Sequence, residues 1–435
     1  MRRGWGASLT ADDSTGSLYE GKAHGPIELT EKVVAISIEG KPCEFRDVSL
    51  RLDEHLDLQL RWTGPLKPGI ARIDQNLKVT FEGGTTAEFL MLSHKYHFVG
   101  HEEFSATSRF SPLDLAGKSK GLAEAVILGG PAIHPKKVGI VLEFGNLAVT
   151  VQPFDHFLAL GGGGARMPLL RTISHRAVLR SLDRRPLKAA KVYEFLDRVS
   201  DFLGFIKGTR VGYGEVRNAA RDGFRCLGFT RADRLEAPKN WFHWALAEEL
   251  PTLFATYMTI FQTPEAKRGV GRALAYYKIS NLSRYDSVET AVIMSAAGLE
   301  TLAAYILGTS GGWTASMLRN VSLAEQIRAC TRLLKIEGDP ADQSELLRKR
   351  LKAKKGQPAR DGFSLLTEFR NGVTHSTPFT YDLDIFDAWD ASQWLLEMQV
   401  LALFGYRGKY QDRRLQMRSY AGNLATLPVS QGNPQ

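Results

Sequence analysis

The sequence predicts an α+β protein, in which an antiparallel β-rich N-terminal part, sandwich- or barrel-like, precedes an all-α helical bundle. Three observations predict this class. Apolar and polar residues alternate over about residues 30–155, as in half-buried antiparallel strands. Turn signals such as Lys67-Pro68-Gly69 and Gly83-Gly84 separate these short runs. From Asn240 onward, apolar residues recur at helical spacing.

Residues 1–25 are polar and rich in Gly and Ser, which predicts a flexible arm, and residues 26–235 form the β-rich domain. Strands are expected at 48–52, 56–62, 77–81, 87–93, 138–144 and 147–152. Residues 156–186 show no clear periodicity of apolar residues and form a transition between these strands and the next helix. An amphipathic helix over 187–205 and a hairpin of 211–216 with 224–229, closed near Asp222-Gly223, complete the domain.

Residues 240–405 predict the antiparallel helical bundle. One apolar stripe contains Val288, Val292, Leu299, Leu302 and Ile306, and a second contains Phe386, Trp389, Leu396, Val400 and Leu403. Shorter helices are expected near 322–335, 342–354 and 361–371. Residues 408–435 are polar and predict a tail without order.

The composition limits which binding partners and which cellular compartment are expected. Lys and Arg number 56 against 47 Asp and Glu, so the net charge of +9 favours an anionic partner, with RNA or DNA first. Cys43, Cys226 and Cys330 are too far apart for a disulfide framework or a zinc pattern, and no convincing metal or cofactor motif occurs. No secretory signal is visible, and Glu300 and Glu397 interrupt the most apolar stretches, which predicts a soluble, cytoplasmic protein without a membrane partner.

The most informative motif is Arg370-Asn371-Gly372-Val-Thr-His375, followed by Pro378. A permanent cation beside a group that titrates near neutral pH suits phosphodiester cleavage, because Arg grips a phosphate and His transfers protons. Gly and Pro predict that the helix breaks here, so that His375 folds back beside Arg370. The alternative is ordinary helix C-capping, since a basic residue and a following Gly are common stop signals.

In context, this motif resembles the Arg-(x4–6)-His motif of ribonucleases in the HEPN superfamily. Upstream, residues 287–302 resemble an early HEPN helix with a Leu299-Glu300 signature, and the order and spacing are most similar to the ApeA-like branch, associated with anti-phage defence. The resemblance covers roughly residues 240–405. It implies catalysis without metal or cofactor: His375 as general acid and base, Arg370 stabilising the charged phosphorane, and Asn371 positioning the phosphate or fixing the loop.

The resemblance also implies a site role for Glu300, which would orient Arg370 from an earlier helix. The alternative is that Glu300 lies on the solvated side of its helix. A basic run precedes the motif and predicts an RNA guide, unless it is only a solvated helix face: Arg348, Lys349, Arg350, Lys352, Lys354, Lys355 and Arg360.

The resemblance thus implies a metal-independent endoribonuclease in which a ribose 2′-hydroxyl attacks the adjacent phosphate. The β-rich domain would be a sensing or targeting domain that responds to a phage-derived trigger, and a homodimer through residues 285–405 would bring two motifs together. The Leu/Ala-rich 291–308 stripe and the 389–404 stripe would bury one face in the bundle and offer their remaining positions to the dimer; the alternative is a monomer whose stripes are fully used internally. The alternative function is a non-catalytic nucleic-acid-binding or dimerisation module with a ligand- or protein-binding β-rich domain.

Overall fold

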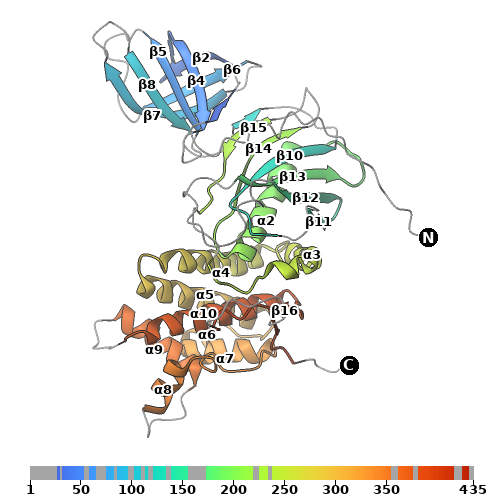
Figure 1. Ribbon diagram of the computed structural model, residues 1–435, viewed down its shortest axis with the longest axis vertical. Coiled ribbons are helices and arrows are strands. Elements are labelled where there is room, and N and C mark those ends of the chain that lie inside the picture. The colour runs from blue at the N-terminus through green and yellow to red at the C-terminus, as the bar shows by residue number, and fades with distance from the viewer. Residues whose placement is uncertain are drawn as a thin grey trace, which may run out of the picture.

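The computed structural model confirms the α+β class: two antiparallel sheets precede a bundle of helices (Figure 1). Figure 1 shows the first sheet at one end of the molecule, the second sheet with helix α2 in the middle, and the bundle at the other end. The structure describes residues 27–29, 32–52, 58–64, 75–82, 86–96, 102–108, 113–115, 121–133, 139–154, 173–218, 225–233, 238–353, 361–375, 381–415 and 424–430.

The first sheet has eight antiparallel strands in the order β1-β4-β5-β8-β7-β6-β2-β3. Its strands are β1 (Ile27–Leu29), β2 (Val33–Ile38), β3 (Lys41–Cys43), β4 (Arg46–Leu52), β5 (Leu58–Gly64), β6 (Asn76–Phe81), β7 (Thr86–Tyr96) and β8 (Glu102–Ser108). The alternation along the chain places Leu60, Trp62, Val79 and Phe81 in the core, as the period of two predicts.

The second sheet has seven antiparallel strands in the order β11-β12-β13-β10-β14-β15-β9. Its strands are β9 (Leu113–Leu115), β10 (Leu122–Leu128), β11 (Ile140–Phe144), β12 (Leu147–Pro153), β13 (Ile173–Ser181), β14 (Gly212–Asn218) and β15 (Arg225–Phe229). The expected hairpin over 211–229 is confirmed as β14 paired with β15. The single β-rich domain therefore contains two sheets, and the expected transition over 156–186 includes the strand β13.

The helices follow the expected order, and hydroxyl or carboxylate side chains start several of them. They are α2 (Ala189–Lys207), the 3-10 helix η2 (Trp244–Glu249), α3 (Leu250–Ile260), α4 (Pro264–Ser283), α5 (Val288–Thr309), α6 (Ala315–Asn320), α7 (Leu323–Leu333), α8 (Glu345–Ala353), α9 (Gly362–Thr374) and α10 (Asp384–Leu403). Ser287 caps α5 by accepting from the Thr290 N–H, and Thr263 caps α4 by accepting from the Ala266 N–H.

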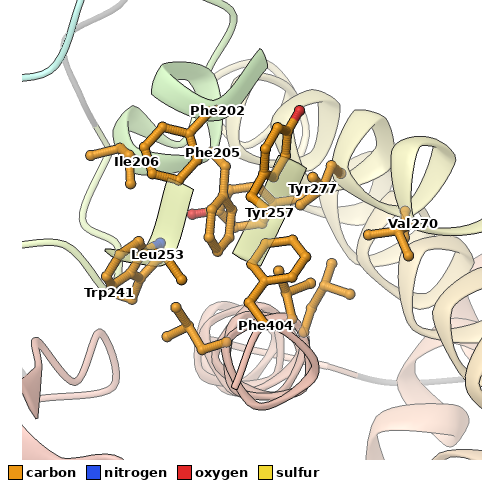
Figure 2. Close-up of a cluster of buried hydrophobic side chains, with 14 of the residues drawn as sticks. Phe202, Phe205, Ile206, Trp241, Leu253, Tyr257, Val270, Tyr277 and Phe404 are labelled. Atoms are coloured by element: carbon orange, nitrogen blue, oxygen red, sulfur yellow. The ribbon is translucent and has the colours of Figure 1, made fainter. Parts of the chain in front are cut away.

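The second sheet and the bundle share one hydrophobic core, although the sequence predicted a boundary near residues 235–240. In Figure 2, Phe202 and Phe205 of α2 lie beside Tyr257 of α3 and Phe404, which follows α10. The ring centroids of Phe202 and Phe254 are 5.1 Å apart, and those of Tyr257 and Phe404 are 5.7 Å apart. Edge-to-face aromatic pairs of this kind hold the sheet and the bundle together as one packed unit.

Hydrogen bonds reinforce this joint at the end of α2. Gly208 ends the helix with φ of 86°, a left-handed conformation that glycine adopts without strain. Asn240 donates to the Lys207 carbonyl over 2.7 Å, and Asn281 of α4 donates to the Gly208 carbonyl over 2.8 Å. A Cβ at Gly208 would lie 3.0 Å from Asn240, so both the conformation and the space require glycine.

The prediction of a tail without order after residue 408 is wrong for the described residues 408–415 and 424–430. Strands β16 (Lys409–Tyr410) and β17 (Ala425–Thr426) pair, and Gln411 donates its N–H to the Trp241 carbonyl over 2.7 Å. Arg413 is fully buried. The polar composition of this segment is explained by its buried ion pairs, which a sequence pattern does not distinguish from solvated charges.

Candidate functional site

The Arg370–His375 motif lies on α9, a helix held firmly in the bundle. Asp361 caps its first turn by accepting from the Ser364 N–H, and Arg328 of α7 binds the Asp361 carboxylate over 2.6 Å. Leu365, Leu366 and Phe369 are buried on its inner face. The candidate side chains at the end of this helix are therefore carried by a rigid element, which favours a defined geometry.

Asn371 contacts both partners of the motif. Its side-chain Oδ1 accepts from the Arg370 Nη1 over 2.9 Å, and its backbone carbonyl accepts from the His375 N–H over 2.9 Å. Arg370 is half-buried, whereas Asn371 and His375 are exposed. Asn371 thus orients the guanidinium and fixes the point at which the chain leaves the helix, so that both candidate catalytic side chains reach solvent at one end of α9.

The helix break lies later than the sequence predicted. α9 continues through Gly372 to Thr374, and His375 is its C-terminal cap with extended backbone angles of φ −109° and ψ 148°. A glycine inside a helix costs only about 1 kcal/mol, which the packing of α9 offsets. In the described part of the chain, no hydrogen bond joins the Arg370 and His375 side chains, and residues 376–380, with Pro378, lie outside it.

Glu300 does not face the bundle interior. It is exposed on α5, next to the buried Leu299, and no hydrogen bond or ion pair to Arg370 occurs among the described residues. The alternative that placed Glu300 on the solvated side of its helix is therefore the correct one. The helical period puts the buried stripe of α5 on Val292, Leu299 and Ile306, and Glu300 is rotated by about 100° from Leu299.

The basic run divides into two parts. On α8, Arg348, Lys349 and Lys352 are exposed, and Lys349 forms a surface ion pair with Glu345 over 2.7 Å. Arg350 differs, because it binds Asp384 over 2.6 Å and covers the Phe369 ring at 4.7 Å. Its charge is used to tie α8 to α9 and α10, so Arg350 does not belong to an exposed RNA guide. Lys354, Lys355 and Arg360 lie outside the described residues.

Sequence reasoning missed a group of buried polar side chains around Arg413. Arg413 donates to Glu397 of α10 over 2.8 Å and to Asn281 of α4 over 3.2 Å, and Tyr277 donates to the same Glu397 oxygen over 2.8 Å. Burial raises the pKa of Tyr277 well above its usual value, so the hydroxyl stays protonated and donates. In the sequence, Glu397 within the apolar pattern of α10 was the only local sign of this buried group, because its partner Arg413 lies beyond the end of that helix.

A metal centre is not formed by the residues that the structure describes, since these contain no group of three His, Cys, Asp or Glu side chains placed to bind an ion. The helix α5 is long and apolar enough to cross a membrane by length and composition. It packs against α4, α7, α9 and α10, and 56 % of its apolar window is buried, as in the core helix of a soluble protein.

Comparison with known families gives a match in the helical half of the chain. A family described as the YopA C-terminal domain matches residues 263–423, from the start of α4 through the buried Arg413. No curated protein and no solved structure matches the chain.

Proposed function

We propose that this protein is a metal-independent endoribonuclease of the HEPN type. The observation that carries the proposal is the Arg370–Asn371–His375 arrangement: a guanidinium held by a neighbouring amide and an exposed imidazole at the cap of the same helix. A ribose 2′-hydroxyl would lose its proton to His375 and attack the adjacent phosphorus. Arg370 would stabilise the charge on the phosphorane, and the leaving 5′-oxygen would take up a proton, which leaves a 2′,3′-cyclic phosphate and a 5′-hydroxyl.

We further propose that the active form is a cytoplasmic homodimer. The apolar helix α5 is only partly covered within one chain: Met294, Ala297, Thr301 and Ala304 are half-buried on one face. The expectation that α10 shares in this surface is wrong, because residues 391–402 are all buried by the surrounding helices and the C-terminal segment. A two-fold contact through α5 is self-complementary and would bring two motifs toward one cleft.

The proposed biological role is anti-phage defence, with the two sheets as the regulator. The shared core between the second sheet and the bundle supports this role, because a phage-derived trigger that moves the sheet would also move α2, α3 and α4. The first sheet lies at the far end of the molecule, where it is accessible to such a trigger (Figure 1).

The test compares the wild type with His375→Ala and Arg370→Ala on RNA in excess EDTA. Each substitution should lower cleavage by about 100-fold or more. Arg319→Ala, which removes an exposed arginine from α6, is the matched control and should cleave normally. Substrates with 2′-deoxyribose at the cut position should resist.

The His375 cap uses only its backbone N–H, so His375→Ala should also keep the free energy of unfolding within about 1 kcal/mol. Normal cleavage by His375→Ala would refute the proposed role of His375. A strict requirement for magnesium would point to a metallonuclease. RNA binding without cleavage would support the alternative of a non-catalytic module.

A further inference from the structure

Arg284 occupies an unusual place at the junction of α4 and α5. It is the C-cap residue of α4, and its guanidinium carbon lies 4.9 Å from the centroid of the Trp389 ring and 5.7 Å from that of Phe386. Its Nε is buried and has no hydrogen-bond partner among the residues that the structure describes. Among the described residues, no carboxylate oxygen lies within 4.0 Å of this guanidinium. Two rings therefore fix its orientation, while the described part of the chain supplies no counter-ion for its charge.

Most arginines that cover rings in this part of the protein differ from Arg284, although Arg198 of α2, whose guanidinium carbon lies 5.4 Å from the centroid of the Phe261 ring, also has no ion pair among the described residues. Four others cover aromatic rings, and each has a carboxylate within 2.8 Å: Arg328 with Asp361, Arg350 with Asp384, Arg413 with Glu397 and Arg414 with Asp412. The carboxylate of Glu289, five residues beyond Arg284, instead accepts from the Tyr381 hydroxyl over 2.7 Å, which lowers the pKa of Glu289.

The position of a cation at a helix C-terminus has an ordinary explanation in the helix dipole. That explanation does not account for the buried Nε, because a buried donor without a partner costs about 1–3 kcal/mol. A stacked guanidinium keeps its in-plane N–H groups free and can hold a phosphate through two parallel hydrogen bonds. The buried Nε is itself out of reach of a ligand, but Arg284 is only half-buried, and an anion would bind the terminal Nη atoms of the guanidinium whose plane the two rings fix.

The surroundings indicate which anion. Tyr285, Tyr381 and Phe386 are exposed by 53 %, 39 % and 38 %, and all three lie at this junction or on segments that contact it. Flat exposed rings beside a phosphate-binding group are the chemistry of single-stranded nucleic acid, whose bases stack while its backbone is held by cations. Tyr381 follows His375 by six residues, which limits their separation to about 20 Å.

We propose that Arg284 binds a backbone phosphate of single-stranded RNA within a few nucleotides of the phosphate that is cut, and that Tyr285, Tyr381 and Phe386 offer stacking surfaces to its bases. This inference rests on the proposed function for the identity of the nucleic acid. It adds a binding residue outside the Arg370–His375 motif and the basic run, and it specifies unpaired RNA as the substrate class.

Binding is measured in a His375→Ala background, so that RNA stays intact, by fluorescence anisotropy with a labelled oligouridylate of about 12 nucleotides. Adding Arg284→Ala should raise Kd about tenfold and reduce the slope of log K against log salt by about 0.7. Arg284→Lys should recover only part of the loss, because lysine is neither planar nor bidentate. Adding Arg272→Ala, an exposed arginine on the same helix, should change neither quantity.

The inference would be overturned if Arg284→Ala left Kd unchanged, or if Arg272→Ala raised Kd by as much as Arg284→Ala does. Tighter binding of a blunt duplex than of the single strand would also overturn it. So would a change of oligomeric mass in Arg284→Ala, which would place the residue between two copies of the chain. Cleavage by the wild type is scored separately. Arg284-dependent binding without cleavage refutes only the ribonuclease proposal, and cleavage with Arg284-independent binding refutes only this inference.

Discussion

Arg413 and Glu397 form a 2.8 Å ion pair in which neither side chain is exposed to solvent. The Arg413 guanidinium also covers the Trp389 ring at 4.5 Å and binds Asp390 over 3.2 Å. Asn281 links Arg413 to the Gly208 carbonyl, so this pair connects the C-terminal segment to α10, α4 and the end of α2. The interior of the protein is thus held partly by charge.

The first prediction concerns this pair. Arg413→Met should lower the free energy of unfolding by about 3–5 kcal/mol, because it leaves the buried Glu397 carboxylate without its counter-ion. The matched control is Lys349→Ala, which removes one partner of the exposed Lys349–Glu345 pair and should cost less than about 1 kcal/mol. Urea denaturation measures both values, and equal stability of the two variants would show that the buried pair is not structural.

The sequence predicted the elements with a clear local period and missed those without one. Strand β10 has four buried residues in succession at its end, so it lacks the alternation that identifies a half-buried strand. Strand β13 carries Arg176 and Arg180, and Arg176 pairs with Glu124 on the neighbouring strand, a contact that only the folded sheet creates. The division into two sheets depends on strand pairings between distant segments, such as β9 with β15.

The candidate site shows the same limit. Helix α9 and its Arg370–His375 motif could be found from the sequence, because the apolar period and the turn signals are local. The structural use of Arg350 could not, because Asp384 lies 34 residues further along the chain. The sequence left two positions open for Glu300, because the apolar composition of α5 hides which of its residues are covered, and the structure places Glu300 on the exposed side.

A second prediction tests how closely α4 and α5 approach. A Cβ at Gly269 would lie 2.7 Å from the Cβ of Tyr305, whereas a Cβ at Gly271 would lie 3.4 Å from Phe261. Gly269→Ala should therefore lose about 1–3 kcal/mol of stability by overpacking, although alanine favours the helix. Gly271→Ala, two residues away on α4, should be neutral or gain up to about 1 kcal/mol. Thermal denaturation of both variants checks this, and equal shifts would refute the close approach.

A third prediction concerns Lys207, which is buried at the end of α2. Burial lowers the pKa of Lys207 from 10.5 to about 8, although Asp233 opposes the shift. Between about pH 8 and 10.5, Lys207 is protonated in the unfolded state but mostly neutral in the folded state. Because the unfolded state binds more protons, the free energy of unfolding rises with pH across that window. Below about pH 8 the charged lysine costs the folded state up to about 3 kcal/mol, as a pKa difference of about 2.5 implies.

Lys207→Met should therefore be more stable than the wild type at pH 7, and the difference should shrink as the pH rises toward 10.5. Lys191→Met, on the exposed side of α2, is the control and should show no such dependence. Urea denaturation at several pH values gives the comparison, and a constant difference between wild type and Lys207→Met would contradict the assigned cause.

The last prediction tests the proposed dimer through the outer face of α5. Ala297 lies half-buried near the middle of that face, between Met294 and Thr301. In a dimer, Ala297→Glu would bring two like charges together across the two-fold axis, so light scattering should report the mass of a monomer. Ser316→Glu on the exposed α6 should remain dimeric. If one cleft requires the motifs of two chains, Ala297→Glu should also lose most RNA cleavage, while its thermal stability stays near that of the wild type. A fully active monomer would refute a cleft built from two chains.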